Sequence, residues 1–136
     1  MKLAADKKIF EFWFRKEYEL NISEKCLKSF VRPEARLCPA DKCTNIGDIV
    51  NLRILDVPGT LNSEPVLSPK VVPAVVEDIK VKKIHEMGPL DFNGSSEDAS
   101  SIDSVISQLE RIYNRPFTGE SVVTIFVIKY IWRWYK

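Results

Sequence analysis

Lys28, Phe30 and Arg32 place two cations and an aromatic ring at alternate positions of one short segment. Alternate residues of an extended strand share a face, so we expect these three side chains on the same side. Cations attract phosphate, and stacking a base on an aromatic ring is worth about 1–3 kcal/mol. The pattern therefore predicts a nucleic-acid contact. The alternative is that Phe30 belongs to the core and the two charged side chains extend past it.

The cysteines and the histidine do not predict a metal site. Cys26, Cys38, Cys43 and His85 lack the spacing of a zinc finger or zinc ribbon. The glycines are isolated, so no phosphate-binding loop is expected. We therefore expect neither a metal nor another cofactor.

The end of the chain, residues 132–136, interleaves aromatic and basic residues. Such a segment can bind a protein partner through Trp132, Trp134 and Tyr135, or stack bases. The alternative is that it extends the last strand and packs Trp132 and Trp134 against the sheet. For Arg111, at the end of a predicted helix, we expect a contact with the carbonyl end of that helix.

The chain has 136 residues, which suits one domain, and a formal net charge of +1. Any attraction for nucleic acid must therefore come from a local patch. Residues 91–110 carry five acidic side chains and no basic one, and we expect them to lie away from a nucleic-acid path or to limit one end of it. Three cysteines, an odd number, and the lack of a secretory leader predict an intracellular protein, cytoplasmic or nuclear. No apolar run is long enough for a membrane helix, so no membrane association is expected.

Hydrophobic patterns predict five strands and two helices. The expected order is strand, helix, three strands, helix and strand. This order predicts an α+β fold with a small barrel-like sheet closed by two helices. Ser100 and Asp103 are expected to form a capping box at the second helix. The strands are expected at 9–14, 26–32, 49–55, 74–84 and 122–130, and the helices at 16–25 and 102–112.

The order of elements, together with particular residues, resembles the ASCH domains of the PUA-like superfamily. The resemblance implies a PUA-like β-barrel of five to six mostly antiparallel strands, with a cleft between barrel and helix. It implies a single domain over 1–136, with loop insertions near 58–70 and 91–100 and an aromatic-basic strand or tail at 129–136. The matching segments are the aromatic 10–14, the strand from Lys28 to Arg32, the turn Gly47-Asp48 before an apolar strand, 109–113 and 122–128.

The resemblance also implies candidate functions. Members of the superfamily bind RNA, and sometimes DNA or a modified nucleoside. Some ASCH proteins are 4-acetylcytidine amidohydrolases with a catalytic Lys, Thr and Glu, and others are described as ribonucleases.

The hydrolase motif Lys-x-x-Thr-x-Arg does not fit this chain. Counting from Lys28 puts Val31 at the Thr position, and counting from Arg32 puts Phe30 there. If the protein is a hydrolase, its candidate catalytic residues are Lys28, Ser29 and either Glu97 or Asp98. Ser29 would need a β-bulge to supply the hydroxyl of the missing Thr.

Binding is therefore favoured over catalysis, which leaves the enzyme assignment open. We expect RNA, or a modified nucleoside, in a basic cleft beside the strand from Lys28 to Arg32. Lys28, Arg32 and Lys16 are expected to contact phosphate, and Phe30 or Trp13 to stack a base. A hydrolase of the ASCH type, a ribonuclease and a protein-interaction adaptor remain the alternatives.

Overall fold

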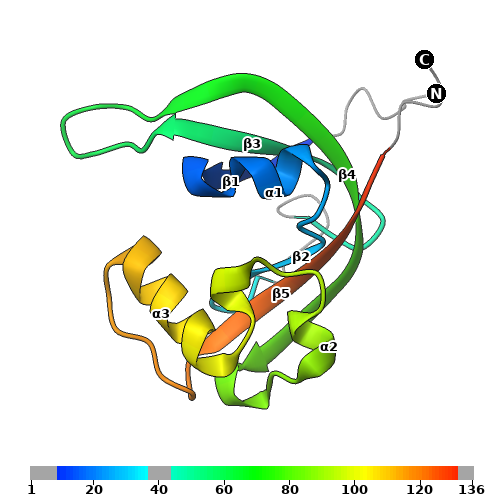
Figure 1. Ribbon diagram of the computed structural model, residues 1–136, viewed down its shortest axis with the longest axis vertical. Helices are drawn as coiled ribbons and strands as arrows, with labels where there is room; N and C mark the ends of the chain where they lie inside the picture. Colours follow the sequence, from blue (N-terminus) through cyan, green and yellow to red (C-terminus); the bar gives the residue numbers. More distant parts are fainter. Residues whose placement is uncertain (1–8, 37–43, 132–136) are drawn as a thin grey trace.

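The computed structural model describes residues 9–36 and 44–131. Across them, five strands form one curled sheet in the order β1-β3-β4-β5-β2. Figure 1 shows this sheet curving around the helices as a half-barrel. The pairing of β1 with β3 is parallel, and the other three pairings are antiparallel. The strands are β1 (Phe10–Arg15), β2 (Ser29–Pro33), β3 (Ile49–Val57), β4 (Val66–Lys83) and β5 (Val122–Tyr130).

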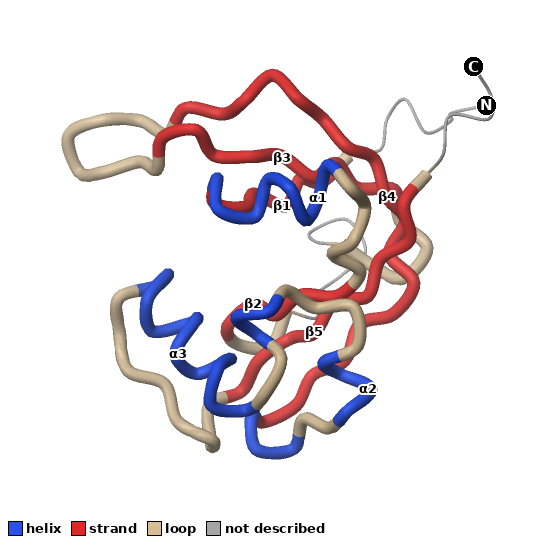
Figure 2. Tube along the Cα trace, in the orientation of Figure 1, coloured by secondary structure: helices blue, strands red, loops and turns tan. Residues whose placement is uncertain are grey.

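The order of the predicted elements is confirmed, and so is the predicted α+β fold with a small barrel-like sheet, which here is an open half-barrel. The two predicted helices correspond to α1 (Glu19–Ser23), preceded by a 3-10 turn at Lys16–Tyr18, and to α3 (Ile102–Tyr113). A short helix that was not predicted, α2 (Pro89–Phe92), lies between β4 and α3, as Figure 2 shows in blue. Short 3-10 turns occur at Ile84–Glu86 and Glu97–Ala99.

Aromatic rings from both edge strands form the centre of one core. The Phe12 ring lies 4.9 Å from the Phe30 ring and 4.8 Å from the Phe126 ring, and Phe14 lies 5.0 Å from Phe30. Phe30 is only 5% exposed, so its ring packs in the core as the alternative interpretation proposed. These contacts bring β1 and β2, the two edges of the open sheet, close together on its inner side.

Helix α3 covers the second core with an amphipathic face. Val105 and Leu109 are buried against Val31 of β2 and Val123 of β5. The predicted capping box at Ser100 and Asp103 is wrong by one residue. Ser101 is the N-cap, and its hydroxyl accepts from the backbone N–H of Ser104.

Two predicted loop insertions are shorter than expected. The strand β4 begins at Val66, so the loop near 58–70 ends at residue 65, and the backbone hydrogen bonds of the sheet explain the difference. This loop projects from the sheet in Figure 1. The segment 91–100 is not one continuous loop, because it contains the end of α2 and the 3-10 turn Glu97–Ala99, and Asp91, Ser96 and Ala99 are buried.

Parts of the predicted organisation lie outside the described residues. They include Cys38, Cys43 and the aromatic residues Trp132, Trp134 and Tyr135. In the described part of the chain, no helix has the length and apolar character needed to cross a membrane.

Candidate ligand-binding cleft

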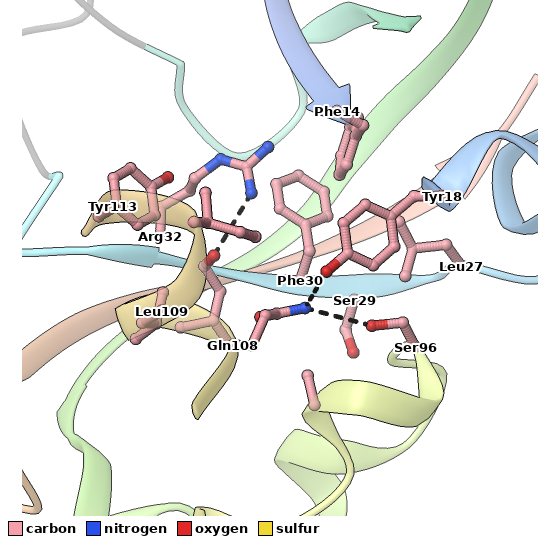
Figure 3. Close-up of a pocket in the computed structure, with 13 residues that line it drawn as sticks. Phe14, Tyr18, Leu27, Ser29, Phe30, Arg32, Ser96, Gln108, Leu109 and Tyr113 are labelled. Atoms are coloured by element: carbon pink, nitrogen blue, oxygen red, sulfur yellow. Dashed lines mark hydrogen bonds between the residues drawn. The ribbon is translucent and has the colours of Figure 1, made fainter. Parts of the chain in front are cut away.

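A narrow cavity lies where α3 faces β2 and the turn before α1. About 30 Å³ is open to the centres of water molecules, which is room for a few waters at most. Figure 3 shows side chains from four separate segments meeting there. The polar lining consists of Tyr18, Ser29, Arg32, Ser96, Gln108 and Tyr113.

Arg32 enters this cavity from β2, among the aromatic rings of the core. Its guanidinium carbon lies 4.7 Å from the centre of the Phe14 ring and 4.9 Å from that of Phe30. One terminal nitrogen donates to the backbone oxygen of Trp13 at 3.0 Å, and the other donates weakly to that of Val31 at 3.4 Å. Arg32 therefore bridges the gap between the two edge strands, and its positive charge rests against ring faces.

No carboxylate of the described residues forms an ion pair with Arg32. Burial lowers the pKa of its guanidinium, because a charged group loses hydration in an apolar setting. Arginine nevertheless remains protonated in proteins. A partly buried cation that lacks an anionic partner has lost some of its hydration, and an anionic ligand would offset that loss.

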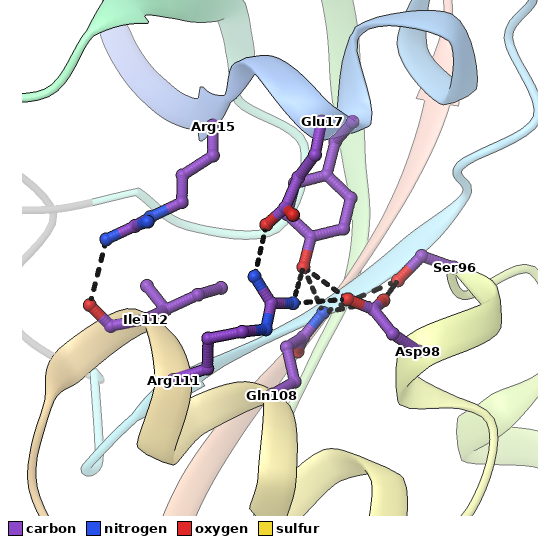
Figure 4. Close-up of polar contacts among 8 residues, drawn as sticks. Arg15, Glu17, Ser96, Asp98, Gln108, Arg111 and Ile112 are labelled. Carbon is purple, nitrogen blue, oxygen red and sulfur yellow. Dashed lines mark hydrogen bonds and ion pairs between the residues drawn. The ribbon is translucent and has the colours of Figure 1, made fainter.

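A polar cluster at the mouth of the cavity joins its two sides. Arg111 of α3 contacts Glu17 at 2.6 Å and Asp98 at 2.7 Å. These ion pairs are drawn in Figure 4. The hydrogen bond to Glu17, followed by that to Tyr18, raises the pKa of Arg111. A second contact joins the two sides where Arg15 donates to the backbone oxygen of Ile112 at 3.3 Å.

Tyr18 connects this cluster to the cavity. Its hydroxyl donates to Asp98 at 2.6 Å and accepts from Gln108 at 2.9 Å and from Arg111 at 3.1 Å. Burial, followed by the hydrogen bond to Asp98, raises the pKa of Tyr18 to about 12. The tyrosine therefore stays neutral near pH 7 and acts as a hydrogen-bonding link, not as a base.

The predicted nucleic-acid contacts are not all gathered in this cavity. Phe30 and Arg32 line it, whereas Lys28 is exposed and lines a separate surface groove with Glu77 and Ile128. Lys28 precedes the first residue of β2, although its backbone oxygen still accepts the N–H of Ile128 in β5.

Trp13 and Lys16 lie outside the cavity as well. Trp13 alternates with buried Phe12 and Phe14, so its ring faces the outside of the sheet, where it is 44% exposed. Its indole N–H donates to Glu11 at 3.0 Å. Lys16 is exposed and paired with Asp56 at 3.1 Å and with Glu19 at 3.5 Å.

The candidate hydrolase residues are not assembled in this structure. The Ser29 hydroxyl is buried and donates to the backbone oxygen of Asn93 at 3.0 Å, and Asp98 is held by Arg111. Glu97 is exposed, and no ion pair between Lys28 and either acid occurs in the described part of the chain. The hydrolase therefore stays a prediction for which the geometry offers no support.

Sequence reasoning did not find Tyr18, Ser96, Gln108 or Tyr113 as members of the site, and it gave Arg111 a different role. We expected Arg111 to contact the carbonyl end of α3. Its side chain instead reaches across the cavity mouth. A signal for Gln108 exists in the sequence, because it lies three residues after Val105 on the otherwise apolar face of α3. A buried amide at such a position needs polar partners.

Metal ligands are not clustered within residues 9–36 and 44–131, where no group of three or more suitable side chains occurs. Cys26 is exposed, and His85 lies 3.2 Å from Glu120 on the surface.

The curled mixed sheet with its cavity-covering helix defines an α+β half-barrel fold. Neither a family model nor a curated protein matches the sequence. Two crystal structures resemble the fold. A DUF984 protein from Enterococcus faecalis V583 has a TM-score of 0.57 at 9% identity, covering 93% of this chain and 82% of that one. The ASCH domain from Lactobacillus crispatus JV V101 has a TM-score of 0.52 at 10% identity, with the same coverage of both chains. These similarities confirm the predicted ASCH-like fold.

Proposed function

We propose that this protein binds single-stranded RNA at the cleft and that Arg32 holds a phosphate group there. The observation that carries the proposal is the guanidinium of Arg32, set among phenylalanine rings without an ion pair to any described carboxylate. A phosphate offers the bidentate acceptor geometry that suits a guanidinium. Ser29, Ser96 and Gln108 line the same cavity, but their donors already bond protein groups, so the proposal depends on Arg32.

The surroundings favour a short stretch of flexible strand over a long duplex. The net charge of +1 does not support extended non-specific coating, so affinity depends on few contacts. Lys28 is exposed just before Ser29, which lines the cavity, so it can hold a second phosphate outside the mouth. Lys16 adds less, because Asp56 and Glu19 already neutralise it.

The size of the cavity sets a condition on this function. Its present volume of about 30 Å³ admits a small group and is too narrow for a nucleobase. A phosphate can approach Arg32 first. A base enters only if α3 and the segment at Arg15–Tyr18 move apart.

The test compares the native protein with Arg32→Gln, using a random pool of short, dye-labelled single-stranded RNA and fluorescence anisotropy at several salt concentrations. Losing one charge-assisted contact is expected to weaken binding about tenfold and to reduce the salt slope, log K against log salt, by about 0.7. Lys83→Gln is the matched control, because it removes one positive charge at a lysine paired with Glu120 away from the cleft. Equal affinity of the native protein and Arg32→Gln, or no binding to the pool at low salt, would contradict the proposal.

A further inference from the structure

We propose that Arg111 exchanges partners on ligand binding: RNA phosphate displaces Glu17 from Arg111, which then becomes the second cationic contact of the cleft. This inference rests on the proposed function and adds a binding residue and a gate to it. In the absence of ligand, Arg111 closes the cavity mouth. In the occupied protein, the same guanidinium holds the RNA.

The position of Arg111 supports the gate. Its guanidinium joins three groups on the other side of the mouth, with Glu17 at 2.6 Å, Asp98 at 2.7 Å and the Tyr18 hydroxyl at 3.1 Å. Figure 4 shows these contacts between α3 and the segments that face it. Because the cavity is too narrow for a base, ligand entry must separate these segments, and that motion breaks the contact with Glu17.

The charges of the cluster support the exchange. Two carboxylates share one arginine, so Glu17 and Asp98 repel each other, and one negative charge is left over. Asp98 has other partners, since the hydroxyls of Ser96 and Tyr18 both donate to it at 2.6 Å. In the described structure Glu17 contacts no other cation, so Glu17 is the partner that a phosphate would replace.

Replacing Glu17 by a phosphate costs little free energy, because the ion pair is exposed. The side chains of Arg111 and Glu17 are each 44% exposed, and ion pairs at such sites contribute little to stability. Arg111 is one hydrogen bond from the cavity through Tyr18, which also lines it. A phosphate held on Arg32 or at the mouth therefore has a second guanidinium within the same polar network.

A second arginine–glutamate pair provides a matched control. Arg115 contacts Glu34 at 3.2 Å, both side chains are exposed, and neither lines the cavity. The guanidinium of Arg115 also lies 4.4 Å from the centre of the Phe117 ring. Neutralising the same member of either pair removes the same charge from the protein, at the cleft in one case and away from it in the other.

The experiment titrates the same RNA pool into Glu17→Gln, Arg111→Gln, Glu34→Gln and Arg115→Gln, each checked for folding by thermal unfolding. We expect Glu17→Gln to bind about two- to fivefold more tightly, because the competing carboxylate is gone. We expect Arg111→Gln to bind about fivefold more weakly, with a salt slope reduced by about 0.7. The two control variants should stay within about twofold of the native protein.

Arg111→Lys is the second variant, used if Arg111→Gln fails to fold. It keeps the charge, so the salt slope should match that of the native protein. Unchanged or tighter RNA binding by Arg111→Gln, or a reduced salt slope in Arg111→Lys, would overturn the exchange. The proposed function would still stand if RNA binding depended on Arg32. If the native protein binds no RNA, the proposed function and the exchange are both wrong.

Discussion

Two charged side chains of this protein, Asp91, which is buried, and Arg32, which is partly buried, have opposite surroundings. Arg32 extends into the cleft among aromatic rings and has only backbone oxygens as hydrogen-bond partners. The Asp91 side chain is 2% exposed and lies between two lysines, with Lys80 at 2.6 Å and Lys82 at 2.8 Å. The charge of Asp91 is fully compensated, and that of Arg32 is not.

The difference separates a structural charge from a charge that is available to a ligand. Asp91 also accepts the backbone N–H of Gly88 at 2.9 Å, which caps the start of α2, while its ion pairs with the two lysines fasten α2 to β4. Burial would raise the pKa of Asp91, but the two lysines and this N–H outweigh it and lower the pKa to about 2. The charge of Asp91 therefore needs no ligand. At Arg32 the missing anion is what a phosphate provides.

The largest expected effect on stability is at Asp91. Asp91→Asn removes the charge that compensates two lysines, and we expect the free energy of unfolding to fall by about 2–3 kcal/mol. This is below the usual cost of breaking a buried pair, because Lys80 and Lys82 are 27% and 32% exposed and can regain water. Urea unfolding at pH 7 measures the loss. Glu64→Gln, in the exposed β3–β4 loop, is the control, and an equal change in both variants would contradict the comparison.

The pH dependence of stability sharpens this difference. The pKa of Asp91 is about 2 in the folded protein against an ordinary value of 3.8, so the stabilisation is present above about pH 4 and is lost as pH falls through 2. We expect this carboxyl to contribute about 1–2 kcal/mol, allowing for partial screening by water. Urea unfolding between these pH values should therefore show the native protein approaching Asp91→Asn in stability. A difference in the free energy of unfolding between the native protein and Asp91→Asn that stayed constant with pH would contradict the lowered pKa of Asp91.

A smaller effect on stability is expected at Arg32. Arg32→Met removes a partly buried cation together with its contacts to aromatic rings, so the free energy of unfolding should change by less than about 1 kcal/mol. Arg53 is the partnered counterpart, 2.9 Å from Glu11, and Arg53→Met should cost about 1–2 kcal/mol. Thermal unfolding of both variants makes the measurement. A larger loss for Arg32→Met than for Arg53→Met would show that Arg32 has a structural role.

The smallest expected effects concern the lysines outside the cavity. Lys28→Ala should reduce the salt slope of RNA binding by about 0.7, the value for one phosphate contact on a single strand. Lys16→Ala should change it less, because Asp56 and Glu19 already hold Lys16. Anisotropy titrations over a range of salt give both slopes. If Lys16→Ala reduced the slope more than Lys28→Ala, the RNA path would run over the outside of β1 and not past β2.

Most of the fold could be predicted because its strands and the long helix α3 are strongly patterned. The strand β5 and the helix α3 were predicted within a residue or so, from β-branched residues and from an apolar repeat. The short helix α2 was not predicted, because four residues are too few to show a helical period. Its position depends on the contacts of Asp91 with Lys80 and Lys82.

The site was predicted only in part. Arg32 could be selected from its position on a strand, but the separation of Lys28 from it depends on where β2 begins. The mouth of the cavity is built from residues far apart in sequence, such as Tyr18 and Gln108, which are 90 positions apart. Local spacing carries no signal for such a contact, and only the packing of α3 against β2 creates it.

The most direct test of the central claim is nuclear magnetic resonance of the arginine side chains during an RNA titration. The claim is that the Arg32 guanidinium contacts phosphate. We expect the Nε–H signal of Arg32 to shift on RNA addition and to saturate at the affinity measured by anisotropy. The signal of Arg115, whose partner is Glu34, should stay in place. Saturable RNA binding that leaves the Arg32 signal unmoved would contradict the account.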